Sequence, residues 1–290
     1  MMVSNLKQQV LIQRASSTGE MKRVLKSFHG TNIGSVPTMG YLHEGHMSLV
    51  EQSLRTCDHT VVSIFVNPIQ FGPNEDLDVY PHDLEGDIEK LESAGVDLLF
   101  QPHRKIIYPE GFKTYVQVDE ITDHLCGKSR PGLFKGVATV VLKLFNIVRP
   151  QHVFFGEKDW QQLAVIEHLV RDLNLDISVH RVPLVRESDG LAMSSRNRNL
   201  TPEERQKALS LSRSLEDAKE KISQGTTAAS QLKQSIKDRI TAESGMQIDY
   251  ISICDPISLQ EIEEVKGRTL IALAVKIGSS RLIDNCIVED

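Results

Sequence analysis

The sequence predicts an α/β protein, in which a Rossmann-like, doubly wound parallel sheet forms the N-terminal domain and a smaller α+β domain follows. Up to about residue 184, short β-branched apolar runs alternate with helical patterns, as in a parallel sheet covered by helices. Beyond residue 199 the chain is polar and helical, and it ends in apolar runs typical of antiparallel strands. Glycine-containing polar segments follow several predicted strands, at the edge where doubly wound sheets bind ligands. We therefore expect domains at residues 1–184 and 185–290.

The N-terminal domain is expected to alternate strands and helices. The apolar runs predict strands at Ile33–Pro37, Thr60–Val66, Val96–Phe100, Val153–Phe155 and Ile177–Val182. Helical patterns lie between them at Gly45–Arg55, Leu84–Ser93, Val137–Val148 and Gln161–Asn174. The helix from Val137 is apolar along one side, which assigns it to the core rather than to a cofactor site.

The C-terminal domain has a clear helix start. Thr201 suits the N-cap, Pro202 the first helical position, and Glu203 the positive end of the helix dipole. The charged faces of this helix and the next are expected to be solvated. We expect the second helix at Ala228–Ser244, and antiparallel strands at Ile248–Ile253, Leu270–Ile277 and Leu282–Val288.

Composition argues against several classes of function. The chain has 290 residues, 40% of them hydrophobic, and a net charge of −6, which fits a globular protein without a broad basic surface for nucleic acid. Its four cysteines are widely separated and form no Cys-x-x-Cys pair, so we expect buried thiols in a reducing cytoplasm. The N-terminus lacks the apolar core of a signal peptide, and no segment approaches the roughly 20 apolar residues of a membrane span.

Two histidines lie close together directly after the first predicted strand. Residues 37–46 read Pro-Thr-Met-Gly-Tyr-Leu-His-Glu-Gly-His, and an apolar helical pattern follows. The first turn of a helix presents unpaired N–H groups and the positive end of its dipole, which suits phosphate. Gly40 and Gly45 let the backbone approach a ligand, and His43 and His46 can donate to one anion. The spacing differs from that of a zinc-protease helix, so the segment indicates a nucleotide site rather than a metal site.

Two further predicted strands also run into polar segments. The second is followed by residues 67–72 (Asn-Pro-Ile-Gln-Phe-Gly), and the fourth by residues 156–162 (Gly-Glu-Lys-Asp-Trp-Gln-Gln). Lys158 carries a compact charge that can neutralise phosphate oxygens, and Asp159 can hold an adjacent lysine, a metal or a ribose. Gln70 and Gln162 are neutral donors and acceptors, suited to a substrate carboxylate that must remain nucleophilic.

A fourth polar segment lies where the two domains are expected to meet. Residues 189–197 read Asp-Gly-Leu-Ala-Met-Ser-Ser-Arg-Asn, and two hydroxyls beside an arginine suit phosphate. We expect a flexible loop that brings the Arg196 guanidinium over a triphosphate.

Ordered motifs extend over nearly the whole chain. Besides the segments at 37–46 and 189–197, they are Phe65–Pro68 with Gln70 and Phe71, Arg130–Gly132, Lys143–Asn146, Gly156–Asp159, Gln161–Gln162 and Arg281–Asn285. In this order they resemble the pantothenate synthetase family, the pantoate–β-alanine ligases. The segments at 37–46 and 189–197 also resemble the two nucleotide signatures of the superfamily that holds class I aminoacyl-tRNA synthetases and nucleotidylyltransferases. The resemblance implies a homodimer whose C-terminal domain is a lid over the active site.

The resemblance also implies a two-step reaction. The carboxylate of (R)-pantoate attacks the α-phosphate of Mg-ATP to give pantoyl adenylate and pyrophosphate, and the amine of β-alanine then displaces AMP to give pantothenate. By position, His46 would be the proton donor, His43 would stabilise the phosphates, and Lys158 and Arg196 would act on the triphosphate.

The binding residues that the resemblance implies fall into the same segments. Gln70 and Gln162 would hold pantoate, and Gln70 would also contact β-alanine. ATP would contact Met39, Gly40, Tyr41, Leu42, His43, Glu44, Gly45, His46, Gly156, Glu157, Lys158, Asp159, Val185, Met193, Ser194, Ser195 and Arg196.

Three positions depart from the family's pattern. Tyr41 stands where a small residue is expected, His82 where an arginine is usual, and Leu133 where a histidine is usual. Asp87, near the start of the helix predicted from Leu84, is a candidate for holding hydrated Mg²⁺, but it is expected to be a lone, solvated acid. The metal ligands are therefore left open.

Two other classes of protein remain as alternatives. One is a nucleotidylyltransferase that stops at the nucleotidyl product, and the other is a noncatalytic nucleotide sensor. A fragment of a tRNA synthetase is disfavoured because the basic surface for tRNA is missing.

Overall fold

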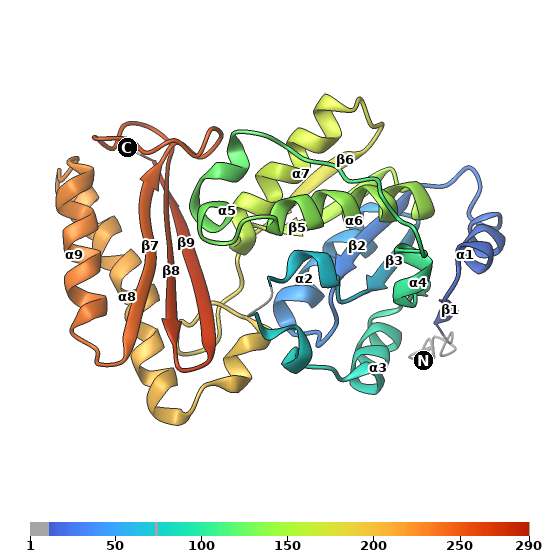
Figure 1. Cartoon of the computed structure of the whole chain (residues 1–290), viewed down its shortest axis with the longest axis horizontal. Coiled ribbons are helices and arrows are strands. Elements are labelled where there is room, and N and C mark those ends of the chain that lie inside the picture. The colour runs from blue at the N-terminus through green and yellow to red at the C-terminus, as the bar shows by residue number, and fades with distance from the viewer. Residues whose placement is uncertain (1–11, 73–74, 290) are drawn as a thin grey trace, which may run out of the picture.

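A six-stranded parallel sheet forms the centre of the larger, N-terminal body of the molecule (Figure 1). The computed structural model describes residues 12–72 and 75–289. The strand order is β1-β4-β3-β2-β5-β6, and each neighbouring pair is parallel, which confirms the predicted doubly wound sheet. The strands are β1 (Gln13–Ala15), β2 (Ile33–Thr38), β3 (His59–Ile64), β4 (Leu98–Phe100), β5 (His152–Gly156) and β6 (Ser178–Val182).

Helices cover both faces of this sheet, because successive side chains of a strand point to opposite sides. Val36, Val62 and Phe154 are fully buried in the core that contains α2 and α3. Val61 and Val153 belong to the opposite core, with α1, α6 and α7. The helices of this body are α1 (Thr18–Leu25), α2 (Glu44–Thr56), α3 (Leu84–Ala94), α4 (Arg104–Ile107), α5 (Leu125–Ser129), α6 (Leu133–Val148) and α7 (Trp160–Asp172).

The strand order changes direction at the centre of the sheet. β2 lies between β3 and β5, so the chain leads one way from β2 through β3 and β4, and later extends the sheet the other way through β5 and β6. Doubly wound sheets bind ligands at this kind of switch point, beyond the carboxyl ends of the strands. The segments that follow β2 and β5 therefore meet at one crevice.

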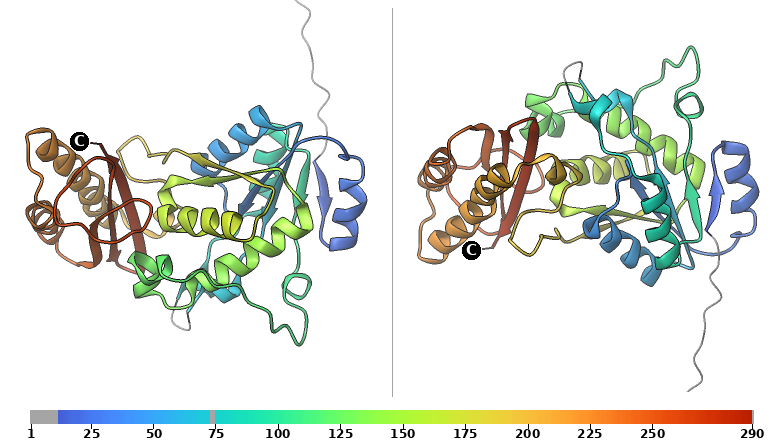
Figure 2. Two further views of the ribbon diagram at one scale, coloured as in Figure 1. Left: turned by 90° about the horizontal axis from the view of Figure 1, so that it is seen from above. Right: turned by 90° about the horizontal axis from the view of Figure 1, so that it is seen from below.

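A three-stranded antiparallel sheet forms the smaller C-terminal part, at the opposite end of the molecule from β1 and α1 (Figures 1 and 2). One face packs against α8 and α9, where Leu211 and Leu232 are buried. On the other face Leu270 joins the core of the N-terminal body. Trp160 Nε1–H also donates to the carbonyl oxygen of Pro256 at 2.9 Å. The elements are α8 (Pro202–Ser223), α9 (Ala229–Thr241), β7 (Met246–Cys254), β8 (Thr269–Ile277) and β9 (Ser280–Val288).

The structure adds elements that the sequence analysis does not predict. β1 has only 3 residues and lies at the edge of the sheet, so it is too short to show the alternation of apolar and polar residues that marks a strand. α1 begins with a capping box, in which Ser17 Oγ accepts the N–H of Glu20 at 3.2 Å, and this Ser-x-x-Glu signal is present in the sequence. α4 and α5 are too short to show a helical period. α6 begins at Leu133, earlier than the predicted Val137, because Gly132 with a φ of 88° forms its N-cap.

The four cysteines are free thiols, as expected. Cys126, Cys254 and Cys286 are buried, and Cys57 is half-buried. Within the described ranges, no helix combines the length and the apolar character needed to cross a membrane.

Candidate active site

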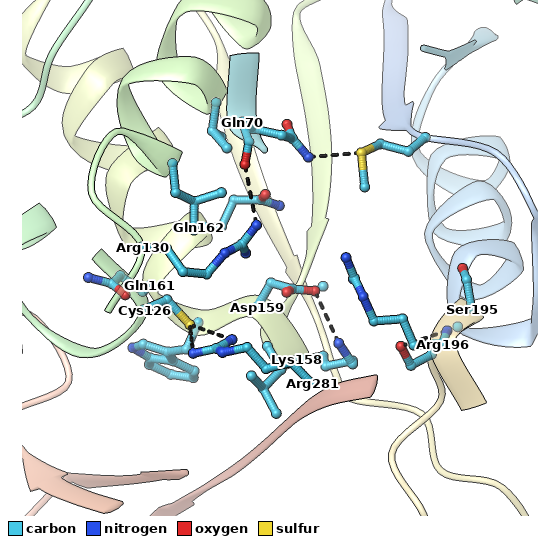
Figure 3. Close-up of a pocket in the computed structure, with 18 of the residues that line it drawn as sticks. Gln70, Cys126, Arg130, Lys158, Asp159, Gln161, Gln162, Ser195, Arg196 and Arg281 are labelled. Carbon is cyan, nitrogen blue, oxygen red and sulfur yellow. Dashed lines mark hydrogen bonds and ion pairs between the residues drawn. The ribbon is translucent and has the colours of Figure 1, made fainter. Parts of the chain in front are cut away.

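A cavity of about 540 Å³ lies at the carboxyl edge of the parallel sheet. Its walls come from the segments after β2, β3 and β5, from α5 and α6, and from residues 183–185 and 193–196. The β8–β9 hairpin and β9 of the C-terminal sheet complete it. Figure 3 shows polar and charged side chains from these distant segments pointing into one space.

A buried carboxylate holds the segment between β2 and α2 against α3. Asp87 is 1% exposed and accepts the backbone N–H of Tyr41 at 2.8 Å and that of Leu42 at 2.6 Å. Lys90 Nζ donates to the carbonyl oxygen of Leu42 at 2.7 Å. Gly40 and Tyr41 have positive φ angles of 84° and 54°, a conformation that suits glycine and is unusual for a bulky residue such as tyrosine. The contacts of Asp87 therefore fix a strained loop.

His43 and His46 lie together at the start of α2, with ring centroids 4.0 Å apart. His46 Nδ1 accepts the backbone N–H of His43 at 3.4 Å, so the neutral His46 ring carries its proton on Nε2. Burial lowers the pKa of His43 to about 4, and the positive charge of Lys158 acts in the same direction. Burial, together with the neighbouring His43 and Lys158, also lowers the pKa of His46 well below its usual value. Both rings are therefore neutral hydrogen-bond donors at pH 7.

Gln70 is positioned by the short 3₁₀ turn after β3. Its Nε2 group lies 2.8 Å from Met39 Sδ, and its Oε1 accepts from Asn67 Nδ2 at 3.2 Å. Asn67 is buried and also donates to the carbonyl oxygen of Gly136 at 3.1 Å. A Cβ on Gly136 would lie only 2.8 Å from the backbone nitrogen of Gln70, so glycine is needed where α6 meets this turn. Gln70 thus projects from a braced backbone.

Gln161 and Gln162 are neighbours in sequence with different environments. The buried Gln161 donates to the carbonyl oxygens of Ile121 at 2.9 Å and His124 at 2.7 Å, and accepts from the N–H of Gly127 at 3.3 Å. Gln162 lines the cavity (Figure 3), and its side chain makes no hydrogen bond with any residue in the described part of the chain. Gln161 therefore anchors the wall, while the amide of Gln162 is available to a ligand.

Lys158 and Asp159 follow β5 and are fixed from the C-terminal sheet. Lys158 Nζ lies 3.6 Å from an Asp159 carboxylate oxygen, and the lysine side chain is 20% exposed. Asn285 Nδ2 on β9 donates to the carbonyl oxygens of Glu157 at 3.0 Å and Lys158 at 2.8 Å. The position of the lysine thus depends on both parts of the molecule.

The segment at 189–197 is held by hydrogen bonds in this structure, and its expected flexibility stays a prediction. The N–H of Met193 donates to the carbonyl oxygen of Val185 at 3.0 Å, and Ser195 Oγ donates to the carbonyl oxygen of Tyr41 at 3.4 Å. The guanidinium of Arg196 lies 5.7 Å from the centre of the Tyr80 ring. These contacts hold the segment beside the loop that precedes α2.

The cavity brings together most of the residues singled out from the sequence. Gly40, Tyr41, Leu42, Glu44 and Glu157 lie outside its lining and shape the backbone of the adjoining segments. The predicted residues that line it are Met39, His43, Gly45, His46, Gln70, Gly156, Lys158, Asp159, Gln162, Val185, Met193, Ser194, Ser195 and Arg196.

Other residues contribute to the site in ways that the sequence analysis did not predict. Arg130, Asp249 and Arg281 also line the cavity, and Asn285 and Asp87 fix its loops. Of these, only Arg130, Arg281 and Asn285 belong to the matched motifs, and the motifs alone gave them no role.

The prediction that Asp87 is a solvated acid is wrong. Both its carboxylate oxygens accept backbone N–H groups, and burial raises the pKa of its carboxyl group. Among the described residues, no three histidine, cysteine or acidic side chains gather as a metal site. Mg²⁺ in nucleotide sites is commonly held by phosphates, water and one or two carboxylates rather than by a protein cage.

These features define a class of protein, the doubly wound α/β proteins with a nucleotide site at the carboxyl edge of the sheet. Here that edge carries two neutral histidines, a lysine and the amides of two glutamines. The model of the family described as pantoate-beta-alanine ligase matches residues 13–287. The chain belongs to this family, the ATP-dependent ligases that join pantoate to β-alanine.

Relatives and solved structures agree with the family match. The chain is 58% identical over 260 residues to pantothenate synthetase from Acetivibrio thermocellus, covering 90% of this chain and 92% of the relative. The crystal structure of pantothenate synthetase from Thermus thermophilus is 44% identical, with a TM-score of 0.91 over 95% of this chain and 99% of that one. The ligase from Francisella tularensis, complexed with beta-gamma ATP and β-alanine, is 37% identical, with a TM-score of 0.78 over 95% and 97%.

Proposed function

We propose that the ligation proceeds through a pantoyl adenylate formed in this cavity. The observation that carries the proposal is the placement of Gln162. Its amide faces the cavity and has no partner within the described residues, although its neighbour Gln161 is fully hydrogen-bonded. A neutral amide can orient a carboxylate without neutralising the charge that makes it a nucleophile. Gln70 supplies a second amide from the segment after β3.

In the first step, a pantoate carboxylate oxygen attacks the α-phosphorus of ATP. A bond forms between that oxygen and phosphorus, the bond from the α-phosphorus to the bridging oxygen breaks, and pyrophosphate leaves with the electron pair. His46 donates a hydrogen bond through Nε2, His43 lies beside it, and Lys158 and Arg196 balance the charge that develops on the leaving group. ATP would bind along residues 39–46, Gly156–Asp159, Val185 and Met193–Arg196, with Asp159 available to its ribose.

In the second step, the amine nitrogen of β-alanine attacks the carbonyl carbon of the adenylate. The bond from carbon to the phosphate oxygen breaks, AMP leaves with the electron pair, and the nitrogen releases a proton to water to give the amide. Gln70 would contact both acyl and amine substrates, because its side chain projects from the 3₁₀ turn after β3 and lies between Met39 and Asn67.

Several properties of the whole protein belong to the same proposal. Mg²⁺ would be held by the phosphates of ATP, where it would screen their charges. Residues 1–184 form the catalytic domain and residues 185–290 the lid over it, supported by the contacts of β9 with residues 157 and 158. Two copies of the chain form a homodimer, which sedimentation tests. The enzyme acts in the cytoplasm, as its free thiols suggest.

The test is product release from Mg-ATP and pantoate, with and without β-alanine, followed by mass detection of the product. We expect AMP and pantothenate only when both substrates are present, and pantoyl adenylate with pyrophosphate when β-alanine is omitted. Pyrophosphate without amine-dependent AMP would indicate a nucleotidylyltransferase instead. ATP-dependent thermal stabilisation without any product would indicate a nucleotide sensor.

A further inference from the structure

Arg130 and Glu75 form an ion pair on the wall of the cavity beside Gln70. Arg130 Nε donates to Glu75 Oε1 at 2.6 Å, and Nη2 contacts the other carboxylate oxygen. The same Nη2 donates to the backbone carbonyl oxygen of Gln70 at 3.3 Å (Figure 3). The Arg130 and Glu75 side chains are 19% and 25% exposed, so solvent and small solutes can reach the pair.

The second substrate needs a cation in this part of the cavity. The carboxylate of β-alanine takes no part in the chemistry, and a buried carboxylate must be paired or hydrogen-bonded. Lys158 and Arg196 serve the phosphates in the proposed function. Arg281 is held by Asp249, with Nε at 2.9 Å and Nη2 at 2.6 Å, and its guanidinium also contacts Cys126 Sγ and Ser129 Oγ, each at 3.4 Å. Arg130 is exposed to a similar extent, but it is the arginine that contacts Gln70.

We propose that Arg130 binds the carboxylate of β-alanine, and that Glu75 occupies the position of this carboxylate in the free enzyme. The two oxygens of Glu75 engage Nε and Nη2 of the guanidinium, as a substrate carboxylate would. The inference rests on the proposed placement of pantoyl adenylate between Gln70 and Gln162. Because Arg130 also touches the backbone of Gln70, a carboxylate held there leaves the amine of a short amino acid beside the activated acyl group.

Exchange of carboxylates has a consequence for affinity. β-Alanine must displace Glu75, so the intramolecular pair weakens binding of the substrate while keeping the guanidinium partnered when the site is empty. Glu75 therefore weakens the binding of β-alanine, and Arg130 strengthens it. If the ion pair were only structural, removal of either partner would loosen the backbone of Gln70 and weaken the binding of β-alanine.

The test uses the full-length enzyme with two amine substrates, β-alanine and 3-aminopropanamide, in which a neutral amide replaces the carboxylate. Arg130→Gln should lower kcat/KM for β-alanine by about 10²-fold, the scale for losing a bidentate charge-assisted contact, and change that for 3-aminopropanamide less than about threefold. Glu75→Gln should instead lower the KM for β-alanine by about threefold or more. Arg130→Lys, which keeps the charge but loses the fork, should fall between wild type and Arg130→Gln.

The control is Arg171→Gln, which removes an exposed guanidinium paired with Asp172 at 2.9 Å and should leave both substrates unaffected. The inference is wrong if Glu75→Gln raises the KM for β-alanine, or if Arg130→Gln impairs both amines equally. Pyrophosphate release by the wild-type enzyme without β-alanine separates the two proposals. If no pyrophosphate is released, the proposed adenylate route is wrong. If it is released, the kinetics of the variants test only the proposed role of Arg130.

Discussion

The carboxylate of Asp87 accepts the backbone N–H of Leu42 at 2.6 Å, and so joins α3 to the loop that opens the active site. Its other oxygen accepts the N–H of Tyr41 at 2.8 Å. Two charge-assisted hydrogen bonds from one buried carboxylate stabilise a loop in which Gly40 and Tyr41 both have positive φ angles. His43 and His46 follow this loop directly, so its backbone decides where their rings lie.

We expect Asp87→Asn to weaken ATP binding and to destabilise the fold. An asparagine amide offers one acceptor oxygen in place of two and turns its NH₂ group toward a backbone N–H. A buried donor without a partner costs about 1–3 kcal/mol, so the free energy of unfolding should fall by that amount. The KM for ATP should rise by about 10-fold or more, measured by pyrophosphate release. Glu89→Gln, an exposed change on the same helix, is the control, and equal behaviour of the two variants would contradict the positioning role of Asp87.

The adjacent glutamines at 161 and 162 provide a matched pair of variants. Gln162→Ala should raise the KM for pantoate at least 10-fold with little change in stability, because its amide has no partner within the described residues. Gln161→Ala leaves the carbonyl oxygens of Ile121 and His124 unpaired, and should lower the free energy of unfolding by about 2–4 kcal/mol. Denaturant unfolding and pantoate saturation curves measure the two effects. A stability loss in Gln162→Ala equal to that of Gln161→Ala would contradict the assignment.

Local patterns account for the part of the fold that the sequence predicts. The strands from Ile33 and Val153 and the helix from Val137 have apolar runs long enough to show a period, and the polar segments after them obey the rule for ligand sites at strand ends. β1 escapes prediction because 3 residues at a sheet edge carry no period. Sequence order also does not reveal that Gln13 pairs with Leu98.

The unpredicted part of the site depends on contacts between distant residues. Asp87 lies 46 positions from Tyr41, and Arg130 lies 55 positions from Glu75. In sequence, Asp87 is an ordinary acid in a first helical turn, where acids are common for electrostatic reasons alone. Only the fold shows that it is buried. The sequence could place the histidines, Lys158 and the glutamines at the cavity, because each belongs to a segment that follows a strand.

His46→Ala and Lys158→Ala should each lower the rate of adenylate formation by at least about 10²-fold, the scale for losing one preorganised group that stabilises developing charge. His46 loses the Nε2 donor, and Lys158 loses the compact charge near the phosphates. Pyrophosphate release in a single turnover measures this step. Lys266→Ala, on a side chain that is 80% exposed, should match the wild type. Turnover within threefold of wild type in both active-site variants would overturn their assignment.

His43 should make the fold less stable in mild acid. Its pKa is lowered from 6.5 to about 4 in the folded protein, chiefly by burial, so the unfolded chain takes up a proton at a higher pH than the folded one. As the pH falls from 6.5 toward 4, the unfolded state is increasingly favoured, and below this range the difference is constant. Between pH 7 and pH 4.5 the contribution amounts to about 2 kcal/mol.

The experiment compares the pH dependence of the free energy of unfolding in wild type and His43→Asn. The variant should lose about 2 kcal/mol less stability over this range, while His29→Asn, at an exposed position, should follow the wild type. Parallel curves for wild type and His43→Asn would show that the imidazole is not held neutral by burial.

Asn285 should affect the first chemical step although it lies on the C-terminal sheet. Its Nδ2 group donates to the carbonyl oxygens of Glu157 and Lys158. Its backbone N–H donates to the carboxylate of Asp284, which pairs with Arg186 at 2.8 and 2.9 Å. Asn285→Ala removes both contacts and should lower the rate of adenylate formation by about 10-fold, since a shift of about 1 Å in a positioned group can reduce rates by up to about 10²-fold. Asn285→Asp should be slower still, because its carboxylate would face two carbonyl oxygens. If Asn285→Ala instead unfolds more easily but forms adenylate at the wild-type rate, the contact holds the two parts of the molecule together without positioning Lys158.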